Sequence, residues 1–158
     1  DDAACCLLSS CEEDCGPVIL DQEMYHFYDA EDIMGFKLTN TGMQMVLDVD
    51  VPNVIASHFD AVIHPFLKKN QLEIKDINYM IFHPGGKKII ATIEEIFAEF
   101  DKDIEDTNSI LADYGNMSSA TVLYVLERIM KRKPQAGELG LMLSFGPGFS
   151  AQRVLLQW

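Results

Sequence analysis

Residues 114–120 read Tyr-Gly-Asn-Met-Ser-Ser-Ala, which places the polar side chain of Asn116 just before an apolar helix predicted for residues 121–130. Five apolar residues of that helix recur at helical spacing: Val122, Leu123, Leu126, Ile129 and Met130. An Asn on a turn before a helix can direct its amide N–H at one fixed point, as the stabilisation of an oxyanion or enolate requires. Taken alone, the stretch is more typical of an ordinary helix N-cap, because Asn, Gly and Ser favour helix starts.

Two other stretches of the chain change that balance. Upstream, His83-Pro84-Gly85-Gly86 follows an apolar strand predicted for residues 77–82 and precedes a second helix. That helix carries one apolar face, made of Ile89, Ile93, Ile96, Phe97 and Phe100. Downstream, residues 141–149 form a strand that runs into a Gly-Pro-Gly turn, and a last strand follows at residues 151–158. We therefore expect His83 at the end of a strand, where the chain turns over glycines.

These three signals, in this order, resemble the second half of a type III polyketide synthase, the chalcone and stilbene synthase-like branch of the thiolase-like enzymes. The family's His-Pro-Gly-Gly, Gly-Asn-Met-Ser-Ser-Ala and Gly-Phe-Gly-Pro-Gly motifs match residues 83–86, 115–120 and 144–148. Ser144 replaces the first Gly of the last motif. The resemblance implies the α/β thiolase-like layered αβαβα fold, with residues 1–158 as its C-terminal half around a mixed five-stranded sheet.

The same resemblance implies that the other half of the enzyme is missing. Family members are much longer than this chain, and their nucleophilic Cys lies in the first half. Asp1-Asp2-Ala3-Ala4 stands where the family has Asp-Gly-Ala-Ala, so residues 1–10 are expected to be the last strand of the absent N-terminal half. Asp2 replaces a Gly at a position where Gly permits close approach of the backbone.

The implied reaction is the decarboxylative condensation of malonyl-CoA with an acyl-CoA starter. His83 and Asn116 would donate hydrogen bonds to the enolate oxygen, and His83 would also keep the Cys thiolate ionised. The implied partners are both thioesters, the N-terminal half of the enzyme and a second copy in a homodimer. No cofactor, metal, nucleic acid or membrane is expected.

Other residues acquire implied roles around the substrate. Ser118 and the loop Phe145-Gly146-Pro147-Gly148 are similar to residues that line the family's cyclisation cavity. Gly85 and Gly86 would let the pantetheine arm of coenzyme A approach the backbone. Met45 stands where plant members have an aromatic gatekeeper, so this part of the pocket is expected to be more pliable.

The amino-acid composition limits the possible partners independently of the three motifs. The formal charge is -13, from 25 acidic and 12 basic residues, which argues against nucleic acid and anionic membranes. No apolar run is long enough to span a bilayer, and the start of the chain has no cleavable basic and apolar signal, so we expect a cytoplasmic domain. The basic groups that hold the phosphates of coenzyme A are expected mainly from the missing half.

All four cysteines lie within the first fifteen residues, at positions 5, 6, 11 and 15. Their spacing contains no Cys-x-x-Cys pair and no His lies close by in sequence, so a metal site is not predicted. A nucleophilic Cys needs a helix N-terminus or a cation to lower its pKa, and this acidic segment offers neither. We expect Cys5 and Cys6 to pack inside the first strand.

The remaining pattern predicts further strands and one long helix. Strands are expected at residues 18–27, 36–39 and 43–47, and a helix at residues 52–69 with a buried stripe. Pro65 should kink or divide that helix, and a loop should join the helices that follow His83 and Asn116. His26, His58 and His64 are expected to be structural or surface residues.

Two alternatives remain open. The chain could be a non-catalytic binding or assembly subunit, because helix faces that pack on the missing half would be exposed as an apolar patch. It could also belong to an enzyme like ketoacyl carrier-protein synthase III. The His-Pro-Gly-Gly and Asn-Met-Ser-Ser pattern favours the polyketide branch over that second alternative.

Overall fold

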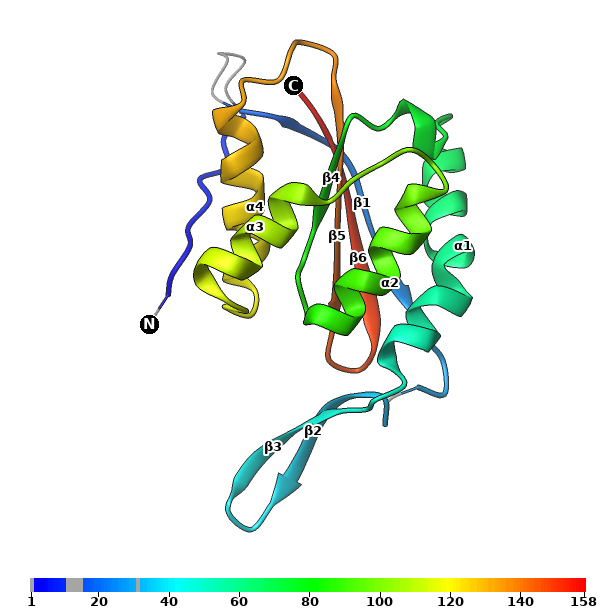
Figure 1. Ribbon diagram of the computed structural model, residues 1–158, viewed down its shortest axis with the longest axis vertical. Coiled ribbons are helices and arrows are strands. Elements are labelled where there is room, and N and C mark those ends of the chain that lie inside the picture. Colours follow the sequence, from blue (N-terminus) through cyan, green and yellow to red (C-terminus); the bar gives the residue numbers. More distant parts are fainter. Residues whose placement is uncertain (1, 11–15, 31) are drawn as a thin grey trace.

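A mixed sheet forms the centre of the molecule (Figure 1). The computed structural model describes residues 2–10, 16–30 and 32–158. The strands lie in the order β1 (Val18–His26), β6 (Ser150–Gln157), β5 (Leu139–Gly146) and β4 (Tyr79–Phe82). β6 pairs antiparallel with both of its neighbours, whereas β4 pairs parallel with β5. The carboxyl end of β4 therefore lies at the end of the sheet where β5 turns into β6.

The sheet has helices on both faces. The helices are α1 (Val51–Lys69), α2 (Lys87–Ala98), α3 (Glu105–Tyr114) and α4 (Ala120–Lys131), and a short 3-10 helix η1 spans Ile74–Asp76. Successive strand residues point to opposite faces. Met80 and Phe82 accordingly join the apolar core with α1 and α2, while Ile81 joins the core with α3 and α4. Three layers result, helix, sheet and helix.

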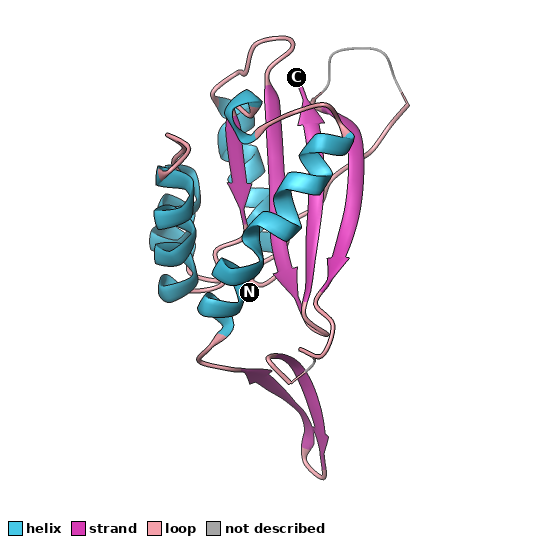
Figure 2. Cartoon of the chain, turned by 90° about the vertical axis from the view of Figure 1, so that its right-hand side faces the viewer, coloured by secondary structure: helices cyan, strands magenta, loops and turns pink. Residues whose placement is uncertain are grey.

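A hairpin extends away from these layers, as both views show (Figures 1 and 2). It consists of β2 (Met34–Thr39) and β3 (Gly42–Leu47), paired antiparallel. Its apolar side chains are largely exposed, namely Phe36, Leu38, Met43, Met45 and Leu47. The strands predicted for residues 36–39 and 43–47 are confirmed.

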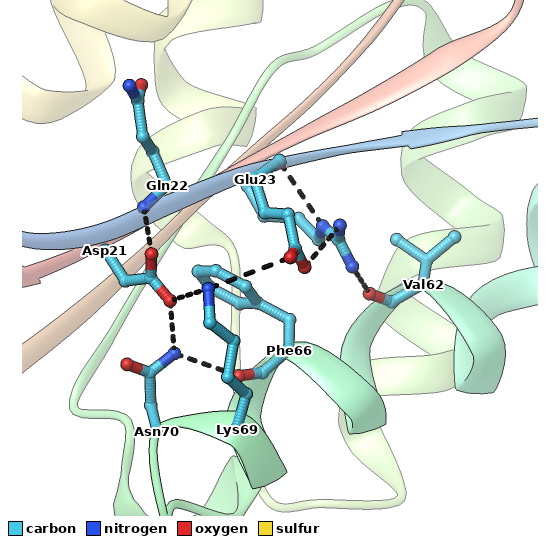
Figure 3. A network of polar contacts seen from close by, with 8 residues as sticks. Asp21, Gln22, Glu23, Val62, Phe66, Lys69 and Asn70 are labelled. Carbon is cyan, nitrogen blue, oxygen red and sulfur yellow. Dashed lines mark hydrogen bonds and ion pairs between the residues drawn. The ribbon is translucent and has the colours of Figure 1, made fainter.

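A polar network fastens the edge strand β1 to α1 (Figure 3). Arg153 of β6 is only 3% exposed and donates to the carbonyl oxygen of Val62 over 2.6 Å and to the carboxylate of Glu23 over 3.0 Å. Its guanidinium also lies 5.1 Å from the ring centre of Phe66. Lys69 of α1 binds Asp21 of β1 over 2.8 Å. The buried cation is thus paired with a carboxylate and with backbone oxygens, which is the condition under which a protein interior tolerates charge.

The structure corrects three predictions about secondary structure. The described sheet has four strands instead of five. Residues 2–10, which were expected to form a strand of the absent half, form no regular element in this chain. Cys5 and Cys6 are consequently exposed instead of packed. Pro65 does not divide α1, which runs unbroken from Val51 to Lys69, so of the two expected effects only a kink stays a prediction. Where a loop was expected, the chain forms α3. Asp1, Cys11 and Cys15 lie outside the described residues.

Candidate active site

His83 directly follows the last residue of β4, as predicted. Its backbone N–H donates to the carbonyl oxygen of Leu143 on β5 over 3.0 Å, and its own carbonyl oxygen accepts from Gly85 N–H over 2.9 Å. Both sides of the residue are therefore fixed by the backbone. The imidazole is partly buried, and among the described residues its Nδ1 atom has no hydrogen-bond partner. Burial lowers the pKa of His83, so the ring is neutral at neutral pH.

Asn116 is not the N-cap of α4. That position belongs to Ser119, whose side chain makes no capping bond. The Asn116 side-chain oxygen instead accepts from Ser118 N–H over 2.9 Å, and its amide nitrogen donates to the carbonyl oxygen of Gly85 over 3.1 Å. The stretch therefore does contain the N-cap, at Ser119, but Asn116 closes a separate turn three residues before it. This turn is further held by Thr121, whose hydroxyl accepts from Met117 N–H and donates to the carbonyl oxygen of Ser118, both over 2.9 Å.

The bond between Asn116 and Gly85 joins the two motifs that lie on either side of α2 and α3 in the sequence. A carboxamide has two N–H donors. The described hydrogen bonds use only one of them, at Gly85, so the second is free to meet a ligand. The structure thus brings the loop of His83 and the turn of Asn116 together at the carboxyl end of β4. Their catalytic roles stay predictions.

Gly85 and Gly86 differ in the room around them. A Cβ atom on Gly85 would meet Ile89 Cδ1 at 2.9 Å, so only glycine fits there without a shift of the α2 side chain. A Cβ on Gly86 would have no neighbour within 4 Å. The backbone at Gly86 is therefore open to an approaching molecule, as the predicted contact with a pantetheine arm requires.

The turn between β5 and β6 reaches the same end of the sheet. Phe145 packs against Phe82, with ring centres 6.0 Å apart, and Phe82 directly precedes His83. Gly148 N–H donates to the carbonyl oxygen of Met34, the first residue of β2, over 3.0 Å. Gly146 is the last residue of β5, and Pro147 begins the turn. The predicted cavity residues 145–148 thus lie between the end of β4 and the base of the hairpin.

Met45 and Ser118 are both exposed. Met45 lies on β3 with 66% of its surface accessible, and no described hydrogen bond or ring contact joins the hairpin strand around it to the His83 loop. Ser118 lies in the Asn116 turn with a positive φ of 57°. The structure places Ser118 beside Asn116 and leaves Met45 on the separate β2–β3 hairpin.

The described residues also form two cavities away from His83 and Asn116. A cavity of about 670 Å³ lies between the C-terminal end of α1 and η1, and one of about 160 Å³ lies between β4, α3 and α4. Neither is lined by His83 or Asn116. Within residues 2–10, 16–30 and 32–158, no three His, Cys, Asp or Glu side chains gather as a metal site would require. No helix in the same ranges is both long and apolar enough to cross a membrane.

Sequence reasoning missed two groups beside the site. Thr107 lies on the unexpected helix α3, and its buried hydroxyl donates to the carbonyl oxygen of Phe82 over 3.0 Å. Lys87 and Lys88 begin α2 and are exposed, although cations are unfavourable at a helix N-terminus. The Lys pair was readable from the sequence, since it directly follows Gly86.

Comparison with known proteins gives the family. Residues 20–158 match the model of "Chalcone and stilbene synthases, C-terminal domain". The chain is 37% identical over 135 residues to the 1,3,6,8-tetrahydroxynaphthalene synthase of Streptomyces peucetius subsp. caesius, which covers 84% of this chain and 36% of that protein. It is 29% identical over 159 residues to the 3,5-dihydroxyphenylacetyl-CoA synthase of Amycolatopsis orientalis, covering 99% of this chain and 43% of the relative.

Solved structures agree with the sequence matches. The crystal structure of PKS-I from the brown alga Ectocarpus siliculosus superposes with a TM-score of 0.78 at 30% identity, covering 92% of this chain and 41% of that one. The tetrahydroxynaphthalene synthase of Streptomyces coelicolor A3(2), a bacterial type III polyketide synthase, gives a TM-score of 0.79 at 26% identity, covering 90% and 41%. This chain spans less than half the length of these relatives. It belongs to the chalcone and stilbene synthase family of type III polyketide synthases, has their thiolase-like fold, and corresponds to their C-terminal domain.

Proposed function

We propose that this chain supplies the oxyanion-stabilising part of a type III polyketide synthase that condenses malonyl-CoA with an acyl-CoA starter. One observation carries the proposal. The Asn116 carboxamide is bonded to Gly85, two residues from a partly buried imidazole whose Nδ1 atom has no described partner. An imidazole and an amide carried by two hydrogen-bonded turns at the same end of the sheet are suited to stabilise a negatively charged thioester oxygen.

The first step would be decarboxylation. The bond between the malonyl carboxylate and its neighbouring carbon breaks, carbon dioxide leaves, and the electron pair passes into an enolate. The enolate oxygen then accepts hydrogen bonds from the ring N–H of His83 and the free N–H of Asn116. The lowered pKa of the His83 imidazole favours its neutral form. A neutral imidazole retains one ring N–H, which can donate to the enolate oxygen.

The second step would be carbon–carbon bond formation. The enolate carbon attacks an acyl thioester on a Cys of the other part of the enzyme, and that thiolate leaves as the new bond forms. Within the described residues Cys5 and Cys6 are exposed on an irregular segment, without the cation or helix N-terminus that activates a thiol. A thiolate placed beside His83 by the other part of the enzyme would raise the pKa of the imidazole again, and the resulting ion pair would favour the thiolate.

Coenzyme A would reach this site past Gly86 and the start of α2. Gly86 leaves open space beside the backbone, and Lys87 and Lys88 follow it directly. The first turn of α2 contains no acidic residue, so the positive end of the helix adds to the two side chains. Phosphate groups of the nucleotide would be attracted to this edge, in a chain that is otherwise strongly acidic.

A chimera tests the proposal. In it, this chain replaces the matching C-terminal segment of the Streptomyces coelicolor tetrahydroxynaphthalene synthase, and carbon dioxide release from malonyl-CoA is followed. We expect turnover by the chimera and a loss on the order of a hundredfold in its His83→Gln and Asn116→Ala variants. His64→Gln, an exposed His on α1, is the matched control and should retain full activity. Full activity of either site variant, or turnover by the isolated chain, would contradict the proposal.

Exposed apolar side chains favour one second candidate, a non-catalytic assembly subunit. Leu7, Leu8, Val18 and Leu38 are all mostly exposed, which is typical of a surface that another protein covers. Under this hypothesis the chain associates with itself or with a partner but the chimera releases no carbon dioxide. Light scattering that shows a well-behaved monomer would argue against it.

A further inference from the structure

Thr107 forms a hydrogen bond to the peptide group between Phe82 and His83. Its side chain is completely buried, and its hydroxyl donates to the carbonyl oxygen of Phe82 over 3.0 Å. The N–H of the same peptide group belongs to His83 and donates to Leu143 of β5, also over 3.0 Å. Because a peptide group is planar, with its C=O and N–H pointing in opposite directions, the two bonds hold it from opposite sides.

The geometry of the sheet explains why this bond is needed. β4 has β5 on one side and no strand on the other among the described residues, so the Phe82 carbonyl points to the open edge of the sheet. A buried carbonyl that lacks a donor is costly. The hydroxyl of Thr107 supplies that donor from α3, at the point where the strand ends.

The same helix also leads to Asn116. α3 carries Thr107 in its first turn and ends at Tyr114, two residues before Asn116. The N–H of Gly115 still bonds to Leu111, so the helical bonding continues almost to the Asn116 turn. About 10 Å of helix thus separates Thr107, which bonds to the Phe82–His83 peptide, from the start of the Asn116 turn.

We propose that Thr107 is a positioning residue, which fixes the direction of the His83 imidazole relative to the Asn116 amide by holding the Phe82–His83 peptide. This inference rests on the proposed function of those two side chains. Thr107 itself touches no reacting atom. Its role is to prevent rotation of the peptide at the unpaired edge of β4, where the described part of the chain places no further strand.

The test compares three variants of this chain. Thr107→Val keeps the shape of the side chain and removes the donor, whereas Thr107→Ser keeps the hydroxyl. Thr92→Val is the matched control, since the Thr92 hydroxyl bonds only within α2, to the carbonyl oxygen of Lys88 over 3.1 Å. If Thr107→Val does not fold, Thr107→Ala removes the same donor without placing a methyl group against the carbonyl.

Two measurements are made on these variants. Backbone amide hydrogen exchange of the isolated chain, followed by NMR, should accelerate at His83 on the order of tenfold in Thr107→Val, while Ile63 in the core of α1 stays unchanged. In the chimera, kcat for carbon dioxide release should fall on the order of tenfold, with KM for malonyl-CoA constant within about twofold. Thr107→Ser should keep both the exchange rate at His83 and kcat close to those of the wild type. Thr92→Val should alter neither the exchange rate nor kcat.

The outcomes separate this inference from the proposed function. Unchanged exchange at His83, or equal acceleration at His83 and Ile63, would overturn the positioning role. An active chimera whose kcat is insensitive to Thr107→Val would overturn it as well. A wild-type chimera without activity would count against the proposed function instead, while accelerated exchange confined to the end of β4 would still support the hold of Thr107 on the peptide.

Discussion

The side chain of Asn116 donates a hydrogen bond to the carbonyl oxygen of Gly85 over 3.1 Å, although the two residues are 31 positions apart in the sequence. This contact makes one site from two loops that belong to different strand and helix units. It uses a donor of Asn116 and leaves the Gly85 backbone fixed next to α2. Changes at Asn116 should therefore affect both the chemistry and the placement of the His83 loop.

Asn116→Asp should abolish most of the activity of the chimera. A carboxylate cannot donate to Gly85 and would repel an enolate, so we expect a loss on the order of a hundredfold or more in kcat for carbon dioxide release. Asn40→Asp introduces the same charge in the exposed hairpin turn and should have little effect. Equal rates for the two variants would argue against a donor role for Asn116.

Lowering the pH should destabilise the chain through His83. Burial lowers the pKa of its imidazole in the folded state below the ordinary value of 6.5, so on acidification the unfolded chain takes up the proton first. This contribution to the free energy of unfolding is present above about pH 6.5 and is lost as the pH falls through the folded pKa. Urea unfolding at a series of pH values should show it, and His83→Gln should remove it while His64→Gln leaves it in place.

Arg153→Met should destabilise the chain without touching the site. The variant loses the contact of the guanidinium with the Phe66 ring, leaves the Val62 carbonyl without its Arg153 donor and leaves Glu23 with only Lys69. Glu23 is half-exposed and can regain water, so we expect a loss of about 2 kcal/mol in the free energy of unfolding. Arg128→Met, which breaks a surface pair with Asp113, should cost less than about 1 kcal/mol. Urea denaturation measures both, and equal values would mean that burial of Arg153 contributes nothing.

Reversing the charges of Lys87 and Lys88 should weaken the binding of coenzyme A thioesters. We expect the double variant Lys87→Glu, Lys88→Glu to raise KM of the chimera for malonyl-CoA on the order of tenfold at low salt, with kcat retained. The effect should shrink as ionic strength rises, because exposed charges are screened. Lys131→Glu with Lys133→Glu, near the far end of α4, is the control. An unchanged KM would remove these lysines from the substrate path.

The sequence was most informative where apolar residues were periodic. The helix predicted for residues 121–130 spans Ala120–Lys131, and His83 follows β4 as expected. α3 was missed because two of its three buried residues, Asp106 and Thr107, are polar, so its inward face has no apolar pattern. Residues 1–10 looked like a strand by composition, but a strand also needs a neighbour to pair with, and composition says nothing about one.

The sequence predicted which residues belong to the candidate site but not the hydrogen bonds that join them. The motifs singled out His83 and Asn116, and the structure adds that Gly85 links their loops. The hydroxyl of Thr107 on the Phe82 carbonyl could not be foreseen, because it depends on which face α3 turns toward the edge of β4. Long-range hydrogen bonds of this kind carry no local sequence signal.

Gly148 has a consequence for the hairpin that carries Met45. Its φ of 77° is one that side-chain-bearing residues rarely adopt, and its N–H holds the carbonyl oxygen of Met34 at the root of β2. This hydrogen bond ties the start of the hairpin to the turn between β5 and β6. A substitution at this one corner residue would therefore change how the base of the hairpin is held, while every residue of β2 and β3 stays the same.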